Sequence, residues 1–377
     1  GLLAGVGGAG GAGGPGGAGG AGGNVNLLGI GGMGGVGGEG ASGGAGGGGG
    51  LWGNGGLGGS GGVGGVGGAS GSGGLLGGVP GAAGTAGPAP TIPLQYMTDG
   101  PAHIGFYINP SIGGGPNVPV LVDTGSRGLT VPLQDVNLAN LGTPGPSGTA
   151  HYGDSSASVL TEEYTTYTTT VNFGNGIVTG PTTVAVVTSA FRTDSSGQYT
   201  VPLSDIPAVM GVGVNVGHFP TSTVQALPGN LGQGVLVNDP MFAPGGTLEF
   251  GPNPLPAVTS VSGAPTATLV LQITPPGGTP GAPQTVYPSA IDAGGQLGVI
   301  PQYLVPGSTA GDPVPLGTTL TVYTGSGTEL YQETFMTADA PTVEPTFNFN
   351  TGILPFYKYP IYISYSPSGF GTTIFDA

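Results

Sequence analysis

Two aspartates, Asp123 and Asp292, could perform acid–base chemistry together, because each one ends an apolar stretch and precedes a turn that contains glycine. Residues 120–126 read VLVDTGS and residues 290–295 read AIDAGG. An Asp-x-Gly sequence after a strand is by itself an ordinary turn signal. Its recurrence in two distant regions suggests that the two carboxylates meet, and like charges about 3 Å apart would share one proton. Such a pair can act as a base on water and as an acid toward a leaving amine.

Composition excludes several other classes of chemistry. The chain has 3 basic and 18 acidic side chains and a net charge of -15, so it lacks the cationic footprint that binds nucleic acids or anionic membranes. The absence of Cys excludes thiolate nucleophiles, Cys-based zinc sites and iron–sulfur clusters. The three histidines, His103, His151 and His218, lack the spacing of metal ligands. We therefore expect no metal, no cofactor, no nucleic-acid partner and no transmembrane segment.

From residue 92 onward the sequence consists of short apolar and β-branched runs separated by Gly, Pro, Asn and Asp. Such runs are typical of strands, and helical periodicity is nearly absent. The clearest runs are residues 118–122, 164–171, 182–187 and 267–273. The region is longer than one ordinary β-sandwich, so the sequence predicts an all-β domain over residues 91–377. We expect two lobes, about 91–255 and about 256–377, with one aspartate in each.

Residues 1–90 contain 48 of the 87 glycines and a single charged side chain, Glu39. They repeat Gly-Gly-X, in which X is small or apolar. Collagen needs a single glycine at every third position with abundant proline, and calcium-binding nonapeptide repeats need aspartate. Two interpretations remain open: the fixed period favours an ordered, packed layer of polyglycine type, whereas the entropy cost of ordering glycine favours disorder. The Pro-rich stretch 79–93 is expected to be a hinge.

The region after the repeats resembles the pepsin-like aspartic proteases over nearly all of residues 92–377. Residues 123–126 resemble the first catalytic motif of that family, and Asp292 matches its second catalytic aspartate. The resemblance implies a bilobal fold in which Asp123 and Asp292 are the catalytic pair. It also implies a set of residues that support the catalytic loops, namely Thr124, Gly125, Ser126 and Gly294.

A second landmark of that family is the flap, a hairpin whose Tyr closes over the substrate. Residues 151–155, HYGDS, resemble it. The resemblance implies that Tyr152, Gly153 and Asp154 bind the substrate. Residues 209–211 are similar to the apolar-apolar-Gly segment that passes behind the first catalytic turn.

The Gly-Gly-X segment resembles the repeat region of mycobacterial PE_PGRS proteins, some of which carry a C-terminal aspartic protease domain. This resemblance implies a secreted protein that reaches the cell surface or cell wall through type VII secretion. It further implies an aspartic endopeptidase whose partners are protein or peptide substrates, including surface proteins of the same cell.

Three positions depart from the family pattern and keep a second interpretation open. Ala293 and Gly295 stand where the family has hydroxyl side chains, so we expect Asp292 to lack a side-chain donor and to hold the shared proton. Thr130 replaces the Trp that anchors the flap Tyr. These changes favour the alternative that the domain is a catalytically weak, protease-like surface binding module.

Three other charged residues receive structural interpretations. Glu162 and Glu163 are expected to lie on a solvated hairpin edge. Arg127, directly after the first motif, could contact the substrate or pair with an acidic loop, and the pairing is the simpler expectation.

Overall fold

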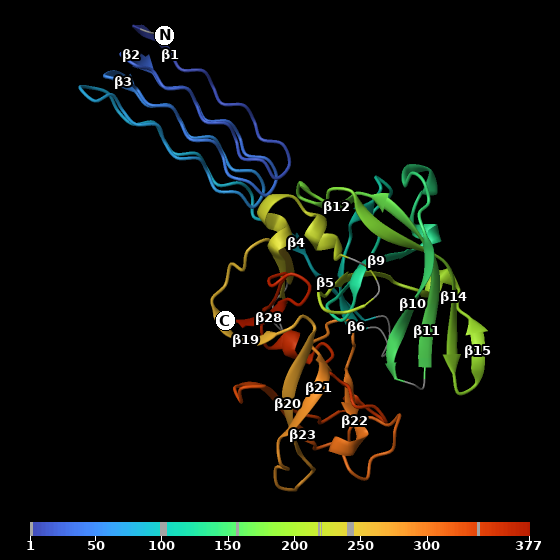
Figure 1. The fold of residues 1–377 in the computed structure, drawn as a ribbon. Coiled ribbons are helices and arrows are strands. Elements are labelled where there is room, and N and C mark those ends of the chain that lie inside the picture. Colours follow the sequence, from blue (N-terminus) through green and yellow to red (C-terminus); the bar gives the residue numbers. More distant parts are fainter. Residues whose placement is uncertain are drawn as a thin grey trace.

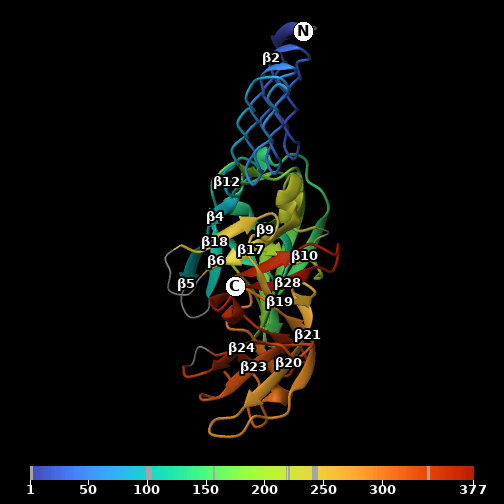
Figure 2. The ribbon, with the colours of Figure 1, turned by 90° about the vertical axis from the view of Figure 1, so that its left-hand side faces the viewer.

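The computed structural model describes residues 3–98, 104–155, 158–217, 219, 221–239, 245–337 and 340–377. These residues form strands joined by 3₁₀ helices of at most five residues, which confirms the all-β expectation. A thin glycine-rich rod projects from a larger body of β-sheet (Figure 1), and the rod and the two lobes follow one long axis (Figure 2). No helix in the described part of the chain is long and apolar enough to cross a membrane.

The glycine-rich rod is an ordered lattice of extended segments in two layers. Segments 3–14, 28–39, 52–63 and 77–88 lie in one layer, and segments 17–26, 41–50 and 65–74 lie in the other. Three short pieces of it are regular β-strands, namely β1 (Ala4–Val6), β2 (Leu28–Ile30) and β3 (Trp52–Asn54). The structure therefore contains the packed layer and not the disordered alternative.

Each Gly-Gly-X triplet uses its two glycines in different directions. The first glycine donates within its own layer, as the N–H of Gly31 does to the carbonyl of Asn54 at 2.9 Å. The second glycine donates to the other layer, as the N–H of Gly32 does to the carbonyl of Gly23 at 2.8 Å. The third residue keeps its side chain on the outside, where Met33 is 55% exposed.

Glycine is required because neighbouring backbones approach more closely than a side chain would permit. A Cβ added to Gly32 would lie 2.0 Å from the carbonyl oxygen of Gly8 in the same layer. A Cβ added to Gly31 would lie 1.9 Å from the carbonyl oxygen of Gly47 in the other layer. The lattice of backbone hydrogen bonds thus offsets the entropy that glycine loses on ordering.

The end of the rod contradicts the expected hinge. Residues 77–88 form the last lattice segment, and β4 (Thr91–Pro93) follows almost at once. The strand β4 pairs with β18 (Thr247–Phe250) of the body. The stretch 79–93 is therefore held by hydrogen bonds at both of its ends, and the prediction of a hinge is wrong.

The turns at one end of the rod dock onto the first lobe. The carboxylate of Glu39 accepts the backbone N–H of Val178 at 2.7 Å. The carbonyl of Gly40 accepts the backbone N–H of Asn230 at 3.2 Å, and the side-chain amide of Asn230 donates to the carbonyl of Gly64 at 3.2 Å. These contacts join the rod's turn at Glu39 and Gly40 to both Val178 and the short helix that contains Asn230, and its turn at Gly64 to that same helix.

The first lobe is built on a nine-stranded sheet in the order β10-β11-β14-β9-β16-β8-β6-β5, with β15 paired to β14. The same lobe contains a small sheet in the order β13-β12-β7. Its residue Val178 donates the hydrogen bond to Glu39 of the rod. The strands of both sheets are β5 (Gln95–Thr98), β6 (Ile104–Ile108), β7 (Ser111–Ile112), β8 (Val120–Asp123), β9 (Arg127–Pro132), β10 (Ser147–Ser155), β11 (Ser158–Thr169), β12 (Val171–Gly174), β13 (Ile177–Val178), β14 (Thr182–Asp194), β15 (Gly197–Thr200) and β16 (Ala208–Val212).

Strands from both lobes share a six-stranded sheet in the order β19-β28-β27-β17-β18-β4, and the second lobe has its own seven-stranded sheet in the order β24-β23-β20-β21-β26-β22-β25. The remaining strands are β17 (Gly234–Asn238), β19 (Ala257–Ser262), β20 (Thr266–Thr274), β21 (Gln284–Ala290), β22 (Val299–Pro301), β23 (Thr319–Thr324), β24 (Glu329–Thr334), β25 (Thr342–Glu344), β26 (Phe349–Asn350), β27 (Ile361–Ser364) and β28 (Thr372–Asp376). The 3₁₀ helices are η1 (Leu133–Asp135), η2 (Leu138–Asn140), η3 (Leu203–Asp205), η4 (Thr223–Ala226), η5 (Gly229–Gln233), η6 (Gln302–Leu304) and η7 (Leu354–Tyr357).

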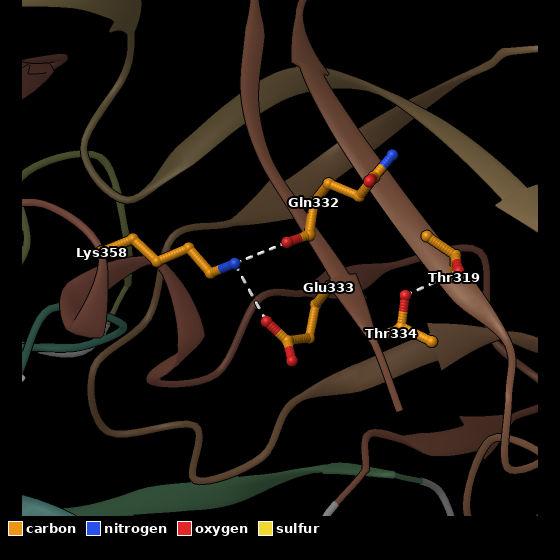
Figure 3. Close-up of polar contacts among 5 residues, drawn as sticks. All are labelled: Thr319, Gln332, Glu333, Thr334 and Lys358. Atoms are coloured by element: carbon orange, nitrogen blue, oxygen red, sulfur yellow. Dashed lines mark hydrogen bonds and ion pairs between the residues drawn. The ribbon is translucent and has the colours of Figure 1, made fainter. Parts of the chain in front are cut away.

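An ion pair fastens the chain after η7 to the edge strand β24. Lys358 Nζ lies 3.0 Å from Glu333 Oε2 and also donates to the carbonyl of Gln332 (Figure 3). Both charged side chains are about one-third exposed, so the pair contributes less than about 1 kcal/mol. Its role is to hold the segment that follows β26 against the second lobe.

We expect Gly32→Ala to destabilise the rod by about 1–3 kcal/mol, because the added Cβ overlaps a backbone oxygen. The matched control is Gly8→Ala, where an added Cβ meets no atom within 4 Å and should leave stability unchanged or slightly raised. Amide hydrogen exchange over residues 1–90 measures both variants. Equal protection in the two proteins would contradict the lattice.

Candidate active site

The two aspartates sit at the ends of buried strands, one in each lobe. Asp123 is the last residue of β8, whose Val120 and Val122 are fully buried. Asp292 lies in the turn after β21, next to the fully buried Ile291. Each aspartate is only 7% exposed, because the apolar residues that precede it in the chain are buried in the core of its own lobe.

Two glycines allow the aspartates to come together, as the sequence predicted. A Cβ added to Gly125 would lie 2.3 Å from Cγ of Asp292. A Cβ added to Gly294 would lie 2.4 Å from Oδ1 of Asp123. Each glycine of one Asp-x-Gly turn therefore faces the carboxylate of the other turn. Any side chain at either position would push the two carboxylates apart.

Thr124 links the two turns across the lobe interface. Its Oγ1 donates to the carbonyl of Ile291 at 2.8 Å and accepts the N–H of Ala293 at 2.8 Å. Thr124 is fully buried, so this hydroxyl would be costly to leave unpaired. Because Ala293 has no hydroxyl, the side-chain hydrogen bonds that link the two turns come from Thr124 of the first lobe only.

Backbone amides and a hydroxyl bind the inner and outer oxygens of Asp123. Its Oδ1 accepts the N–H of Gly125 at 2.7 Å, and its Oδ2 accepts the hydroxyl of Ser126. On the other side, Oδ1 of Asp292 accepts the N–H of Gly294 at 2.9 Å. Of the four residues expected to support the catalytic loops, Gly125, Ser126 and Gly294 thus donate to the carboxylates, and Thr124 links the two turns.

Asn350 supplies the donor that Asp292 was expected to lack. Its Nδ2 donates to Oδ2 of Asp292 at 2.7 Å, and its Oδ1 accepts the N–H of Gly352 at 2.9 Å. The next residue, Thr351, accepts the N–H of Asp292 through Oγ1 at 3.2 Å. A Cβ on Gly295 would lie 2.5 Å from Oδ1 of Asn350. The loss of the family's hydroxyl at position 295 therefore makes room for the amide.

This contact corrects the expectation that Asp292 must hold the shared proton. Both carboxylates have side-chain donors, Ser126 for Asp123 and Asn350 for Asp292, so the number of donors no longer selects one of them. Burial and the nearby charge of Asp292 raise the pKa of Asp123 well above its ordinary value. The pair therefore retains one proton to a higher pH than an isolated aspartate would.

The hairpin β10–β11 places Tyr152 over the first lobe's side of the site. Tyr152 pairs with Leu160 across the hairpin, and its hydroxyl lies 3.2 Å from Oγ1 of the buried Thr130. Thr130 thus supports the Tyr in place of the family's Trp. Burial raises the pKa of Tyr152, so its hydroxyl stays protonated.

The two other predicted flap residues follow Tyr152 in β10. Gly153 is exposed and has a φ of 129°, a left-handed conformation that favours glycine. The backbone of Asp154 belongs to the same strand, but its side chain lies outside the described residues. Its predicted contact with substrate therefore stays a prediction.

Glu162 contradicts the expectation of a solvated edge. Its side chain is 1% exposed and pairs across the strands with Ala150 and Ala190. Its Oε2 has no hydrogen-bond partner among the described residues. Burial raises the pKa of Glu162 to about 7. Glu163, the next residue, points to the exposed face, where it accepts the hydroxyl of Ser189.

The remaining candidates build no second centre. His151 is exposed and its Nδ1 lies 3.0 Å from Oγ1 of Thr161, whereas His103 and His218 lie outside the described residues. Within the described ranges no cluster of His, Asp and Glu could hold a metal ion. Arg127 donates to the carbonyl of Val214 at 2.9 Å, and among the described residues it forms no ion pair with an acidic side chain.

Glu162→Gln should flatten the dependence of stability on pH. The folded state holds the Glu162 proton up to about pH 7, whereas the unfolded chain loses it near its ordinary pKa of 4.5. The folded state binds more protons between these values, so the free energy of unfolding falls as pH rises through this window, by about 3 kcal/mol in total.

Urea unfolding of the wild type and the variant at pH 5 and pH 8 measures this difference. The Gln variant should gain stability relative to wild type at pH 8 only, and the exposed neighbour provides the control, Glu163→Gln. An equal gain at both pH values would show that Glu162 does not titrate in the folded protein.

Comparison with known proteins agrees with this geometry. A family model described as the PE-PGRS C-terminal aspartyl peptidase-like domain matches residues 90–373. The chain is 46% identical over 311 residues to PE cleavage protein A of Mycobacterium tuberculosis (strain CDC 1551 / Oshkosh). This match covers 76% of this chain and 51% of that protein. It is 44% identical over 295 residues to PE cleavage protein A of Mycobacterium marinum, and this match covers 71% of this chain and 50% of that protein.

The chain spans about half the length of these relatives. The family match begins where the glycine-rich rod ends and includes both aspartates, the flap hairpin and Asn350. The protein therefore belongs to the family of PE-PGRS proteins with a C-terminal aspartyl peptidase-like domain.

Proposed function

We propose that the protein is an aspartic endopeptidase that hydrolyses peptide bonds with a water molecule activated between Asp123 and Asp292. The observation that carries this proposal is the reciprocal fit of the two turns, in which each glycine faces the opposite carboxylate at under 2.5 Å from an added Cβ. A structural turn would have no need for such an approach. The names of the relatives, which describe cleavage, support the same conclusion.

The proposed reaction uses one proton shared by the pair. The ionised carboxylate removes a proton from water as the water oxygen attacks the carbonyl carbon of the peptide bond, and the protonated carboxyl gives its proton to the carbonyl oxygen. The resulting tetrahedral intermediate collapses when a proton passes to the amide nitrogen and the C–N bond breaks. The products are a carboxylic acid and an amine, and the pair again holds one proton.

The departures from the family pattern do not favour the alternative of an inert binding module. Asn350 replaces the missing hydroxyl donor to Asp292 at 2.7 Å, and Thr130 lies within hydrogen-bonding distance of the flap Tyr152. Thr124 braces both turns. The donor to Asp292 and the support of the flap Tyr are thus each supplied by another side chain, and the link between the two turns is kept by Thr124 alone.

We propose that the substrates are proteins at the mycobacterial cell surface or cell wall, reached through type VII secretion. The support is the match to mycobacterial PE cleavage protein A and to the PE-PGRS family. The nearly uncharged rod and the net charge of -15 fit a protein that works outside nucleic-acid-rich surroundings.

Asp123→Asn and Asp292→Asn should each lower peptide cleavage by at least about 10²–10⁴-fold, because either change removes a member of the acid–base pair. Turnover of an acid-denatured protein, followed by mass spectrometry, measures the loss. The control is Asp205→Asn on the exposed helix η3, which should cleave at the wild-type rate. Near-normal turnover by either pair variant would refute the proposal.

Absence of turnover by the wild type would favour the alternative of a protease-like binding module. If the wild type binds a transition-state peptide inhibitor and cleaves nothing, the chain is the protease-like binding module and not an endopeptidase.

Asn350→Ala should move the alkaline limb of the pH–rate profile upward by roughly 1–2 pH units. The amide donates to the ionised carboxylate, and a hydrogen bond to a charged group is worth about 1.5–3 kcal/mol. Without it the pair keeps its shared proton to higher pH. The matched control is the exposed neighbour, Asn348→Ala. An unmoved or lowered limb would show that Asn350 does not set the acidity of the pair.

A further inference from the structure

The second lobe, at the end of the molecule opposite the rod (Figure 1), contains a pocket of about 640 Å³. This volume is typical of cavities that hold small-molecule ligands. Strand β21 runs from Gln284, which lines the pocket, to Ala290, two residues before Asp292. Because a strand rises about 3.3 Å per residue, the two ends of β21 lie roughly 20 Å apart. The pocket is therefore separate from the aspartate pair.

The walls of this pocket are largely apolar. Leu271 and Ile273 of β20 line it from the sheet, and Leu304 of η6 lines it as well. Pro275 and Pro306 belong to two of its loops, where the ring of proline restricts the backbone. Among the described residues that line the pocket, none carries a charge. A ligand that fits these walls is neutral and mostly apolar, because a buried ion would have no counter-charge.

One buried polar atom of the pocket has no partner. Thr318 lines the pocket and is 1% exposed, and its Oγ1 forms no hydrogen bond among the described residues. The backbone N–H of Phe335 donates to the carbonyl of Thr318 at 3.0 Å, which continues the pairing of β23 with β24. A buried hydroxyl without a partner is costly, so a ligand atom that bonds to it would gain affinity.

The register of the sheet places this hydroxyl on the side of the apolar walls. Side chains two residues apart in a strand lie on the same face, so Thr318 shares its face with Leu320. Leu320 pairs with Ile273 of β20, and Ile273 lines the pocket. The hydroxyl of Thr318 therefore lies at the buried end of a pocket that is otherwise apolar on this face.

Large apolar side chains are exposed beside the pocket. Tyr303 lines it, and the ring of Tyr303 lies 6.1 Å from the ring of the exposed Phe347. Leu316, which follows the lining residue Pro315, is also exposed. These side chains continue the apolar surface beyond the cavity, so a chain longer than the cavity would remain in contact with the protein.

We propose that this pocket binds a neutral aliphatic molecule, such as a fatty alcohol or a fatty acid ester. The oxygen of the ligand bonds to Oγ1 of Thr318, and its alkyl chain extends along Leu271 and Ile273 toward Tyr303. This arrangement pairs the buried hydroxyl and covers the apolar walls at the same time.

An extended peptide fits the pocket less well. Each residue of a peptide brings an N–H and a C=O that need partners when they are buried. Among the described lining residues, only Thr318 offers a buried side-chain atom that is still without a hydrogen bond. One such atom matches the single polar group of an aliphatic alcohol or ester.

The test titrates the full chain with aminoanthracene, a neutral fluorophore whose emission rises in apolar surroundings, and then displaces it with octanol. Displacement should be saturable. Thr318→Val removes the hydroxyl and should weaken octanol binding by roughly three- to tenfold. Octanoate should bind at least about tenfold more weakly than octanol, because its charge would be buried without a counter-charge.

A matched control is Thr223→Val in η4 of the first lobe. Thr223 is also buried, its Oγ1 likewise has no partner in the described part of the chain, and it does not line this pocket. Thr223→Val should leave octanol affinity unchanged. Both variants should unfold at or above the wild-type temperature, since each removes an unpaired hydroxyl.

Two further measurements locate the binding site. Butylbenzene has no oxygen, so the Thr318→Val chain should bind it at least as tightly as the wild type does. Ser308→Trp adds a ring at a partly exposed position that lines the pocket. This variant should bind aminoanthracene at least about tenfold more weakly, because the ring fills part of the cavity.

The proposal is overturned if octanol does not displace the fluorophore, or if the wild type and the Thr318→Val chain bind octanol equally. Equal affinity for octanol and octanoate would also overturn it. Displacement by the apolar peptide acetyl-Leu-Leu-Leu-amide and not by octanol would assign the pocket to peptides instead. The assay measures no hydrolysis, so its outcome is independent of whether the chain is an endopeptidase.

Discussion

This molecule depends on one constraint: at certain glycines a backbone segment lies so close to a carboxylate or to another backbone segment that no Cβ would fit. At the aspartate pair it operates twice, at Gly125 and Gly294, each of which faces the opposite carboxylate. In the rod it operates in every inner triplet, as at Gly31 and Gly32. The same absence of a side chain that makes glycine costly to order thus allows both the glycine-rich rod and the aspartate pair to form.

The bilobal body converts that local fit into a stable site. The six-stranded sheet shared by both lobes fixes their relative position, and the hydroxyl of Thr124 then bonds both turns at once. Like charges at such short range oppose folding. The pair is tolerated because it holds one proton and because Ser126 and Asn350 bind the outer oxygens. Stability given up at this point is recovered in the apolar cores of the lobes.

The strand patterns and the two Asp-x-Gly turns could be predicted from sequence, because each depends on neighbours along the chain. The pairing of Asp123 with Asp292 was suggested by the recurrence of the turn and by the family resemblance. The packed lattice could be foreseen only as one of two alternatives, since composition does not show whether hydrogen bonds outweigh entropy. Asn350 was missed because it reaches Asp292 from 58 residues away and follows no local motif. Glu162 was misplaced because a charged pair in a hairpin usually faces water, and strand alternation buries one of the two.

The turns of the rod carry a mechanical consequence. Gly16, Gly40 and Gly64 all lie against residues 228–231 of the first lobe, so every second turn rests on the body and the others lie at the far end. A segment of this extended type rises about 3.1 Å per residue, which sets the reach of the rod. A further back-and-forth pair would widen it sideways and add nothing to its length. The number of repeats in such a chain therefore sets the width of the rod, whereas the distance between the peptidase-like body and the far end of the rod stays the same.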